Sequence, residues 1–350
     1  MKTYGFGIIG CGMISDFHAA AISELEHGQL VGVSSRNADN AKRLTDTYNV
    51  DGYSDYHELL KRGDLDIVCV CTPSGAHLEP AIAAAEAGKH VVVEKPLEIT
   101  LQRCDEIIQA CDEADVQLCA IFNSRFTEGA ELVKSTIASG RFGKLTLGDA
   151  YIKWYRSQEY YDSGGWRGTW DLDGGGALMN QSIHAIDLLQ YFMGPVKSVQ
   201  AFTDTLAHER IEVEDVAVAA LRFENGALGV IEGTTAAYPG MFKKTEICGT
   251  KGTAILEEED IVKWEFDPEL PEDSEIREKF AQQTDTGGGA SDPRAINHAN
   301  HRRQLENLIN GLENDASILV DGREGRKAVE IILAIYQSSR EGRIVELPLQ

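Results

Sequence analysis

The sequence lacks the features that mark membrane, secreted and metal-binding chains. No run of about 18 uninterrupted apolar residues occurs, which excludes a transmembrane helix. The seven cysteines are scattered and form no CxxC pair, so neither a disulfide framework nor a zinc site is predicted, and a reducing cytoplasm is favoured. The first residues, MKTYGFGIIG, lack the charged region and long apolar region of an export signal, and none is predicted.

Basic residues are also scarce. The 33 Lys and Arg residues face 56 Asp and Glu residues, which gives a formal net charge of −23. Such a surface repels nucleic acid and anionic lipid, so neither is an expected partner, and its simplest role is solubility. An anionic ligand then needs helix N-termini and individual Arg or Lys residues. The 350 residues are enough for two domains.

A glycine-rich turn follows the first apolar run. Tyr4–Ile9 leads into GCGMIS, in which Gly10 and Gly12 occupy the first two places of a G-x-G-x-x-G fingerprint and Ser15 the third. The first glycine makes the tight turn, and the second lets a pyrophosphate approach the start of the next helix, expected over Ile14–Leu25. The predicted cofactor contacts from this turn are Gly10, Gly12, Met13 and Ile14.

The residues after the second strand bear on the type of dinucleotide. Leu30–Val33 is followed by Ser34, Ser35 and Arg36, where an NAD site usually has an acidic residue on the ribose hydroxyls. Two hydroxyls and a guanidinium suit a 2′-phosphate better, so Ser35 and Arg36 favour NADP(H) over NAD(H). The alternative is that Arg36 stacks on adenine or points into solvent.

Apolar strands and helices then alternate. Continuous apolar runs at Asp66–Cys71, His90–Val93 and Val116–Phe122 predict strands buried on both faces, and helices are expected over Ala76–Ala87 and Thr100–Ala114. This order predicts a doubly wound parallel sheet, a Rossmann domain over residues 1–123, whose ligands bind at the carboxyl ends of the strands. The polar residues at such ends are Thr72, Pro73, Glu94, Lys95 and Asn123.

The strict alternation stops after Asn123, and residues 124–350 are predicted to form a second, α+β domain. A helix over Glu128–Ser139 precedes successive strands that imply a large, open, mainly antiparallel sheet, with an Asn-Gly hairpin at Asn225 and Gly226. Pro268–Arg294, which contains Gly287–Gly289, is expected to be a mobile loop. The remaining expected elements are strands at Leu145–Tyr155, Val196–Thr203, Val216–Phe223, Ala227–Gly233, Thr245–Cys248, Thr253–Leu256 and Ile261–Phe266, helices at His298–Glu313 and Arg323–Arg340, and a final strand in RIVELPL.

One apolar helix carries three polar residues. In GGGALMNQSIHAIDLL, Asn180, His184 and Asp187 stand at i, i+4 and i+7, which is one face of an α-helix. A buried, hydrogen-bonded core histidine would explain His184 without any function. A zinc site is a poor alternative because further ligands of suitable spacing are missing.

Three motifs together identify a resemblance. A GxGxxS turn, then CTPSGAHLEPAIAAAEAGKHVVVEKPL, then GGGALMNQSIHAIDLL resemble the Gfo/Idh/MocA family of oxidoreductases, which includes glucose–fructose oxidoreductase and inositol dehydrogenase. The resemblance covers essentially the whole chain. It implies an NAD(P)-dependent enzyme acting on CH-OH groups, and a homodimer or homotetramer formed through the open C-terminal sheet.

The family also implies roles for particular residues. Lys95 polarises the substrate oxygen, His184 serves as base or proton relay, and these two roles could be exchanged. Asn180 stands where many members have Asp; since an amide cannot accept a proton, Asn180 is left with substrate hydrogen bonding. Asp187 is either an orienting partner or a plain structural carboxylate. Cofactor contacts are expected from Thr72, Pro73, Glu94, Lys95 and Asn123, and from His77, for which a structural role at a helix start is an equal alternative.

Aromatic and basic residues upstream of the histidine helix suggest a carbohydrate substrate. Tyr155 and Trp166 could stack on sugar rings, and Arg167 could pair with a carboxylate or phosphate. Arg125 could reach substrate or only tie the domains together. The run YYDSGGWRGTWDLDGGG with MNQSIH is most similar to family members that oxidise the 3-hydroxyl of nucleotide-linked N-acetylglucosaminuronate or related sugars. The alternative is that Trp166 and Trp170 only pack the cleft wall.

Two other functions share this fold. A glycosidase with tightly held NAD would oxidise, eliminate and reduce in one turnover and release free sugar with no net change in nicotinamide. A non-catalytic sugar or cofactor sensor should lose the Lys/His pair, and this chain keeps Lys95 and His184.

Overall fold

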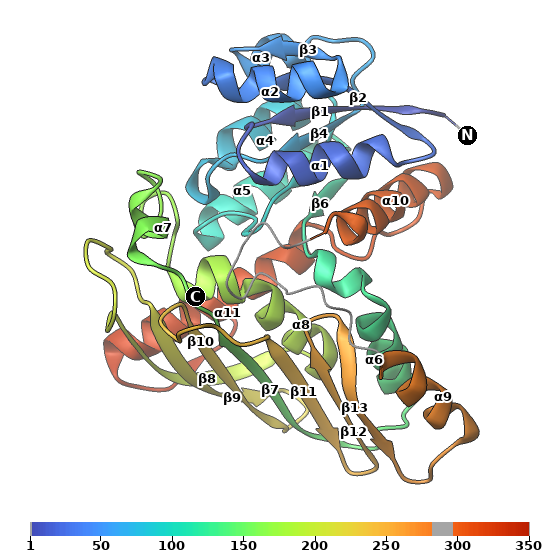
Figure 1. The fold of residues 1–350 in the computed structure, drawn as a ribbon, viewed down its shortest axis with the longest axis vertical. Coiled ribbons are helices and arrows are strands. Elements are labelled where there is room, and N and C mark those ends of the chain that lie inside the picture. The colour runs from blue at the N-terminus through green and yellow to red at the C-terminus, as the bar shows by residue number, and fades with distance from the viewer. Residues whose placement is uncertain (1, 282–296, 350) are drawn as a thin grey trace. The chain divides into compact units, whose positions relative to one another are not determined.

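The computed structural model describes residues 2–281 and 297–349 and divides into two compact units (Figure 1). Unit 1 consists of Met1–Asn123, Asp171–Gly174 and Asn297–Val329, and unit 2 of Ser124–Trp170, Gly175–Ile296 and Glu330–Gln350. Among the described residues, no helix combines the length and apolar character that a membrane span requires.

Unit 1 is built on a six-stranded sheet in the order β3-β2-β1-β4-β5-β6, and every neighbouring pair is parallel. This is the doubly wound Rossmann order, and it confirms the predicted fold class. The continuous apolar runs become strands because both faces of β4 and β5 are buried. The strands are β1 (Tyr4–Ile9), β2 (Gly28–Ser34), β3 (Asp51–Tyr53), β4 (Ile67–Val70), β5 (His90–Val93) and β6 (Leu118–Ala120).

Helices connect these strands, and several have clear end signals. Thr100 caps α5 by accepting the N–H of Arg103, and Asn37 caps α2 by accepting the N–H groups of Asp39 and Asn40. The segment α2–β3–α3 was not predicted, because its residues are mostly polar and exposed. The helices are α1 (Ile14–Ser23), α2 (Ala38–Tyr48), α3 (Tyr56–Leu60), the 3₁₀ turn η1 (Ser74–Ala76), α4 (Leu78–Glu86) and α5 (Leu101–Glu113).

The chain returns to unit 1 near its end. Helix α10 (Ala299–Asn314) places Leu305, Leu308 and Ile309 in the same apolar core as Phe6 and Ile8 of β1. A division into residues 1–123 and 124–350 therefore assigns Asn297–Val329 to the wrong unit. The physical reason is burial: the apolar face of α10 is covered by the first sheet, which no local pattern of the helix reveals.

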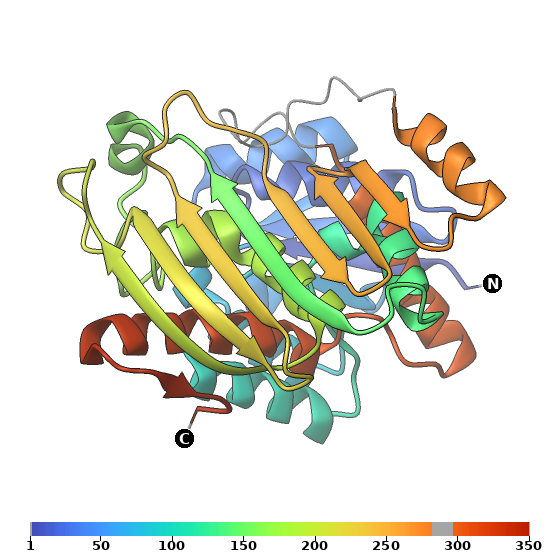
Figure 2. The same ribbon diagram turned by 90° about the horizontal axis from the view of Figure 1, so that it is seen from below.

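Unit 2 contains an eight-stranded sheet in the order β13-β12-β11-β7-β10-β9-β8-β14, seen face on in Figure 2. It is antiparallel except for the pair β7 and β10, which is parallel, so the expectation of a mainly antiparallel sheet is confirmed with one exception. A long connection separates these two strands, as a parallel pair requires. The strands are β7 (Leu145–Lys153), β8 (Val196–Asp204), β9 (Val216–Phe223), β10 (Leu228–Thr234), β11 (Lys244–Gly249), β12 (Gly252–Glu257), β13 (Asp260–Phe266) and β14 (Val345–Glu346).

The predicted Asn-Gly hairpin joins β9 and β10. Gly226 has a φ of 88°, which favours glycine, and the side chain of Asn225 accepts the N–H of Ala227 at 2.9 Å. The antiparallel register follows directly, with Arg222 opposite Leu228. This prediction is confirmed.

The expected loop over Pro268–Arg294 is wrong in its first part, where α9 (Pro271–Phe280) forms. Pro271 begins the helix, and the Asp273 carboxylate accepts the Leu270 N–H at 2.7 Å and the Trp264 Nε1–H at 2.7 Å. The glycines Gly287–Gly289 lie outside the described residues. The other helical segments are η2 (Asn123–Phe126), α6 (Glu128–Ala138), α7 (Gln158–Asp162), the π-helix η3 (Ala177–Ser182), α8 (Ile183–Met193) and α11 (Gly322–Glu341).

Candidate active site

The glycine-rich turn of unit 1 has the shape that a bound diphosphate needs. Gly10 has a φ of 94°, and a Cβ there would lie 2.7 Å from backbone atoms of Cys71 and Thr72, so no other residue fits. A Cβ on Gly12 would meet no atom within 4 Å, because that position faces open space. Ser15 is buried, and its hydroxyl donates to the Gly12 carbonyl. The turn is therefore tight at Gly10 and open at Gly12.

Helix α2 places a cation that was not predicted, Arg43, beside this turn and the start of α1. Met13 is 39% exposed and Ile14, the first residue of α1, is half-buried. Arg43 of α2 forms an ion pair with Asp16 and donates to the carbonyls of Cys11 and Gly12, each at 3.3 Å. Its charge offsets the carboxylate in the first turn of α1. Since Arg43 is an ordinary exposed position of a polar helix, the sequence offered no signal for it.

The end of β2 carries the residues that bear on the adenosine end of a dinucleotide. Ser34 is buried, and its carbonyl accepts the Gly10 N–H at 2.8 Å, which ties β2 to the glycine-rich turn. The Ser35 hydroxyl accepts the Asn37 N–H at 3.2 Å, and Arg36 is exposed. A hydroxyl and an exposed guanidinium thus stand where the fingerprint usually has an acid.

His77 supports two turns at the ends of neighbouring strands. It is 1% exposed, and its ring nitrogens lie 2.9 Å from the Pro96 carbonyl and 3.0 Å from the Thr72 carbonyl. Burial lowers the pKa of its imidazole. Thr72 and Pro73, after β4, are both half-buried. His77 therefore has the structural position that was the alternative to a cofactor contact, and it links the Thr72 turn to the Lys95-Pro96 turn.

Lys95 stands out from its surroundings at the end of β5. Of the residues from Val91 to Glu98, Lys95 alone is not buried. Its backbone N–H donates to Glu94 Oε2 at 3.1 Å, and the Lys95-Pro96 peptide bond is cis. The Glu94 side chain is turned inward and is buried, as is that of Asn123, at 4% and 9% exposure. The turn therefore leaves the Lys95 side chain accessible and buries the Glu94 carboxylate.

Unit 1 thus gathers most of its predicted site residues on one edge. Strands β1, β4, β5 and β6 are neighbours in the parallel sheet, so Gly10, Thr72, Lys95 and Asn123 follow adjacent carboxyl ends. Ligands of doubly wound sheets bind at this edge, near the point where the strand order reverses between β1 and β4. Thr72 and Lys95 are half-buried and can contact a ligand bound at this edge, whereas Asn123 is buried.

The polar helix of unit 2 differs from its predicted form. Residues Ala177–Ser182 are a π-helix, and the α-helix α8 begins only at Ile183. Asp187 is fully buried, whereas Asn180 and His184 are half-buried, so the third member of the predicted stripe does not share the exposure of the other two. From Asp173 to Gln190, however, every residue is buried except Asn180 and His184. The segment therefore exposes the amide and the imidazole and nothing else.

Glu214 anchors the start of this segment and was missed from the sequence. Its carboxylate accepts the N–H groups of Gly176 at 2.9 Å and Leu178 at 2.8 Å, and the Tyr336 hydroxyl at 2.9 Å. A carboxylate at a helix N-terminus satisfies free N–H groups and matches the helix dipole. Burial raises the pKa of Glu214 to about 7, although its three donors act in the opposite direction. No sequence signal links Glu214 to a helix nearly 40 residues earlier.

Arg125 has a structural place rather than the substrate contact that was considered for it. Its guanidinium donates to both carboxylate oxygens of Asp187, at 2.7 and 2.6 Å, and lies 4.3 Å from the centre of the Tyr191 ring. Arg125 is 1% exposed and Asp187 is 0% exposed. A buried arginine in a two-pronged bond with a carboxylate is committed to that partner. The pair joins η2 to α8.

The aromatic and basic residues upstream of η3 form a stack. Arg167 lies 4.8 Å from the ring centres of both Trp166 and Tyr160, and Arg156 continues the series toward Tyr160 and Trp154 at 5.5 and 5.2 Å. The amide of Gln181, next to Asn180, donates to the Tyr160 hydroxyl at 3.2 Å. Tyr155 lies apart from this stack, edge-on to Tyr238 at 5.2 Å. Trp166 and Arg167 are thus held in fixed orientations, both half-buried.

Both units match one group of enzymes in their sequence patterns. The model of an oxidoreductase family with an NAD-binding Rossmann fold matches residues 4–122, and the model of the GFO/IDH/MocA C-terminal domain matches residues 131–255. Together with the parallel sheet and its glycine-rich turn, these matches define an NAD-binding oxidoreductase. The chain belongs to the Gfo/Idh/MocA family.

Individual relatives are similar along the whole chain. The WlbA dehydrogenase from Bordetella pertussis, in complex with NADH and UDP-GlcNAcA, is 38% identical, with a TM-score of 0.92 over 100% of this chain and 99% of that chain. The WlbA enzyme from Chromobacterium violaceum, with the same two ligands, is 34% identical, with a TM-score of 0.89 over 100% and 97%. Myo-inositol 2-dehydrogenase of Thermotoga maritima is 28% identical over 97% of this chain and 98% of its own.

Proposed function

We propose that the protein transfers a hydride between a nicotinamide dinucleotide and the 3-hydroxyl carbon of a nucleotide-linked uronic acid sugar. The observation that carries this proposal is the exposure pattern of two otherwise buried segments. Within Val91–Glu98, Lys95 is the only residue that is not buried. Within Asp173–Gln190, only Asn180 and His184 are not buried. Oxidation of an alcohol needs a base for the hydroxyl proton and a group that stabilises the developing negative charge, roles that an imidazole and a cation can fill.

The dinucleotide would be held by the edge of the first sheet. Gly10 and Gly12 supply the tight and open parts of the turn, and the N–H groups at the start of α1 bind the diphosphate. When bound, the nicotinamide supplies the hydride acceptor or donor. The proposed contacts from the neighbouring strand ends are Thr72, Pro73 and Lys95.

Two side chains carry out the proposed removal of the proton from the substrate hydroxyl. Lys95 donates a hydrogen bond to the reacting oxygen and stabilises the negative charge that develops there when the hydroxyl loses its proton. His184 accepts that proton, because an imidazole titrates near neutrality. Asn180 holds the substrate by hydrogen bonds and takes no proton.

The substrate class rests on the relatives and on the stacked arginine. Two relatives that align over the whole chain carry NADH and UDP-GlcNAcA in their crystal structures. Arg167 lies 4.8 Å from the ring centres of both Trp166 and Tyr160, and a guanidinium can pair with a carboxylate through two hydrogen bonds. We propose Arg167 as the partner of the uronate carboxylate and Trp166 as a stacking surface for the sugar.

The proposal predicts turnover with UDP-GlcNAcA as substrate. Incubation with NAD⁺ or NADP⁺ should give absorbance of the reduced nicotinamide at a rate at least about tenfold above that with UDP-GlcNAc, which lacks the carboxylate and its charge-assisted hydrogen bonds. The product should be the 3-keto sugar, identified by mass spectrometry. Release of free sugar without net reduction of the nicotinamide would instead identify the glycosidase, and equal rates for both substrates would contradict the uronate assignment.

We further propose that NADP(H) is preferred to NAD(H), since Ser35 and the exposed Arg36 follow β2 where an acid would favour NAD(H). Replacing Arg36 with Asp should shift the ratio of NADPH to NADH affinity by about tenfold to a hundredfold toward NADH, through loss of one charge-assisted bond. Fluorescence titration with each nucleotide measures the ratio. Lys61→Asp, at the exposed residue that follows α3, is the charge-matched control, and an unchanged ratio in Arg36→Asp would remove the basis of this preference.

The open face of the second sheet is proposed as the contact between copies of this chain. Phe202 and Val218 lie opposite one another on β8 and β9 and are 77% and 46% exposed, and a second exposed pair, Leu228 and Leu147 of β10 and β7, is 47% and 40% exposed. Large apolar side chains exposed side by side on a sheet indicate an interface. A homodimer or homotetramer is expected in sedimentation velocity, and a monomer at micromolar concentration would contradict it.

A further inference from the structure

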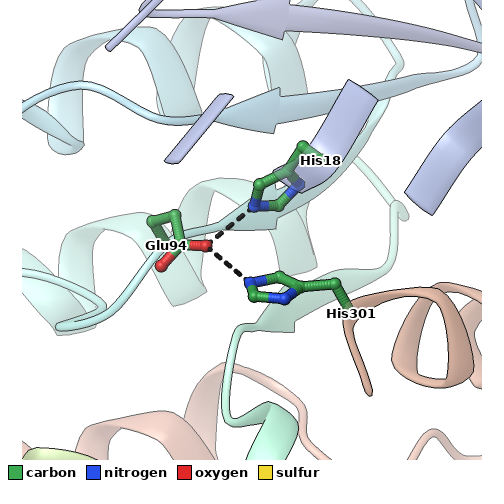
Figure 3. A group of neighbouring side chains, drawn as sticks. All are labelled: His18, Glu94 and His301. Atoms are coloured by element: carbon green, nitrogen blue, oxygen red, sulfur yellow. Dashed lines mark hydrogen bonds and ion pairs between the residues drawn. The ribbon is translucent and has the colours of Figure 1, made fainter. Parts of the chain in front are cut away.

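A cluster of three ionisable side chains lies inside unit 1, directly behind Lys95. His18 comes from α1, Glu94 from the residue after β5, and His301 from α10 (Figure 3). Glu94 Oε1 is 2.8 Å from His18 Nε2 and 3.4 Å from His301 Nε2. All three residues are buried, with exposures of 0%, 4% and 3% for His18, Glu94 and His301. None of the three has a task in the proposed chemistry.

The hydrogen-bond pattern assigns a proton to each imidazole. A carboxylate accepts only, so both Nε2 atoms that face Glu94 Oε1 carry hydrogen. The Asn123 amide nitrogen lies 3.1 Å from His301 Nδ1 and donates to it, which requires Nδ1 to be unprotonated. His301 is therefore neutral, with its hydrogen on Nε2. The remaining oxygen, Glu94 Oε2, accepts the backbone N–H of Lys95 at 3.1 Å.

A metal ion fits this cluster poorly. Zinc holds its ligands at about 2.0–2.2 Å in a tetrahedron, which keeps two ligand atoms roughly 3.3 Å apart or more. The 2.8 Å between His18 Nε2 and Glu94 Oε1 is shorter than that and is the length of a charge-assisted hydrogen bond. The geometry is that of a clamped carboxylate.

The carboxylate at the centre stays ionised. Burial by itself would raise the pKa of Glu94, but the hydrogen bonds from His18 and His301 outweigh it and hold the pKa well below its usual range. Burial lowers the pKa of His301, in agreement with a neutral ring. Other titratable groups that act on the cluster are Cys69 of β4, Cys71 just after β4, Cys119 of β6, His77 ahead of α4 and His298 ahead of α10.

We propose that His18 and His301 are positioning residues for Lys95, acting through Glu94. The two imidazoles fix the carboxylate, and the carboxylate fixes the backbone of the lysine that polarises the substrate oxygen. His18 lies on the helix that follows the glycine-rich turn, so the same network connects the dinucleotide helix to the lysine turn. The expected effect on kcat rests on the proposed function, whereas the expected effect on the Lys95 backbone does not.

Kinetics of paired variants test the link to catalysis. His18→Leu and His301→Leu should each lower kcat about tenfold to a hundredfold, because a shift of the lysine misplaces its donor. His18→Gln and His301→Gln should recover most of the loss, since the glutamine amide supplies a donor near the position of Nε2. Loss of one donor raises the pKa of Glu94, so the acid limb of the kcat profile should move to higher pH in the Leu variants. His57→Leu, at an exposed histidine of α3, is the control.

Hydrogen exchange tests the same link without any substrate. The Lys95 amide should exchange about tenfold faster or more in the Leu variants and at the original rate in the Gln variants. The Val91 amide, which donates to the Gln117 carbonyl at 2.9 Å, should be unaffected and reports that β5 remains folded. Nitrogen-15 spectra of the wild type should show both imidazoles protonated at Nε2.

The outcomes distinguish a failure of the positioning role from a failure of the proposed function. Folded Leu variants with wild-type kcat and an unchanged Lys95 exchange rate would overturn the positioning role, as would one tightly bound zinc per chain or imidazoles that lack hydrogen at Nε2. A wild type without turnover would contradict the proposed function alone, and Lys95 exchange in the Leu and Gln variants would still decide whether His18 and His301 hold the lysine turn.

Discussion

Replacing Lys95 with alanine is expected to lower kcat with UDP-GlcNAcA by about a hundredfold to a thousandfold, the usual loss when one donor to a developing oxyanion is removed. The affinity for the dinucleotide should fall far less, because the glycine-rich turn and the start of α1 remain intact. Steady-state rates from the absorbance of reduced nicotinamide, together with fluorescence titration of the nucleotide, measure the two effects separately.

The control for this variant is Lys61→Ala, which removes an exposed lysine of the same unit just after α3 and should leave kcat unchanged. The split between kcat and nucleotide affinity is the diagnostic result. If Lys95→Ala keeps its turnover, Lys95 does not polarise the substrate oxygen. If nucleotide affinity collapses in parallel with kcat, the main contribution of Lys95 is to cofactor binding and not to polarising the substrate oxygen.

The second large effect concerns stability. Replacing Asp187 with leucine leaves the Arg125 guanidinium buried without the carboxylate that it binds at 2.7 and 2.6 Å. Removal of one partner of a buried ion pair costs about 3–5 kcal/mol of unfolding free energy. Urea unfolding followed by tryptophan fluorescence reports on this unit specifically. All four tryptophans belong to unit 2: Trp154, Trp166, Trp170 and Trp264.

The double variant Arg125→Met with Asp187→Leu distinguishes the loss of the pair from the loss of packing. Since both charges are then absent, it should recover much of the stability lost in Asp187→Leu, and the coupling energy follows from the double-mutant cycle. Asp162→Leu, in the exposed Arg210–Asp162 pair, should change the urea midpoint little. A double variant that is less stable than either single variant would contradict this account.

Local sequence patterns were sufficient for much of the first unit. The apolar runs at β4 and β5 predicted buried parallel strands because such strands need continuous burial and no alternation. The GCG turn and the position of Lys95 after β5 followed from the same reading. The predicted strands of the second sheet were also found, since alternation and an Asn-Gly turn are local signals.

Longer-range features were not predictable in this way. The three-residue polar stripe assumed α-helical spacing, but Ala177–Ser182 forms a π-helix whose first N–H groups are held by Glu214. From the sequence, Arg125 could either contact substrate or hold parts of the chain together. Its bond to Asp187, 62 positions away, is visible only in the tertiary structure. The parallel β7–β10 pair and the return of α10 to the first core depend on which surfaces become covered.

By itself, the sequence determined the Rossmann sheet, the dinucleotide turn, the family and the chemical type of the exposed groups, because each is encoded by neighbours within one strand, turn or helix. Only the tertiary structure showed which polar side chains are accessible and which are buried and held by hydrogen bonds. His18 meets Glu94 across 76 positions, and a buried charge is stable only where packing brings its donors within hydrogen-bond distance.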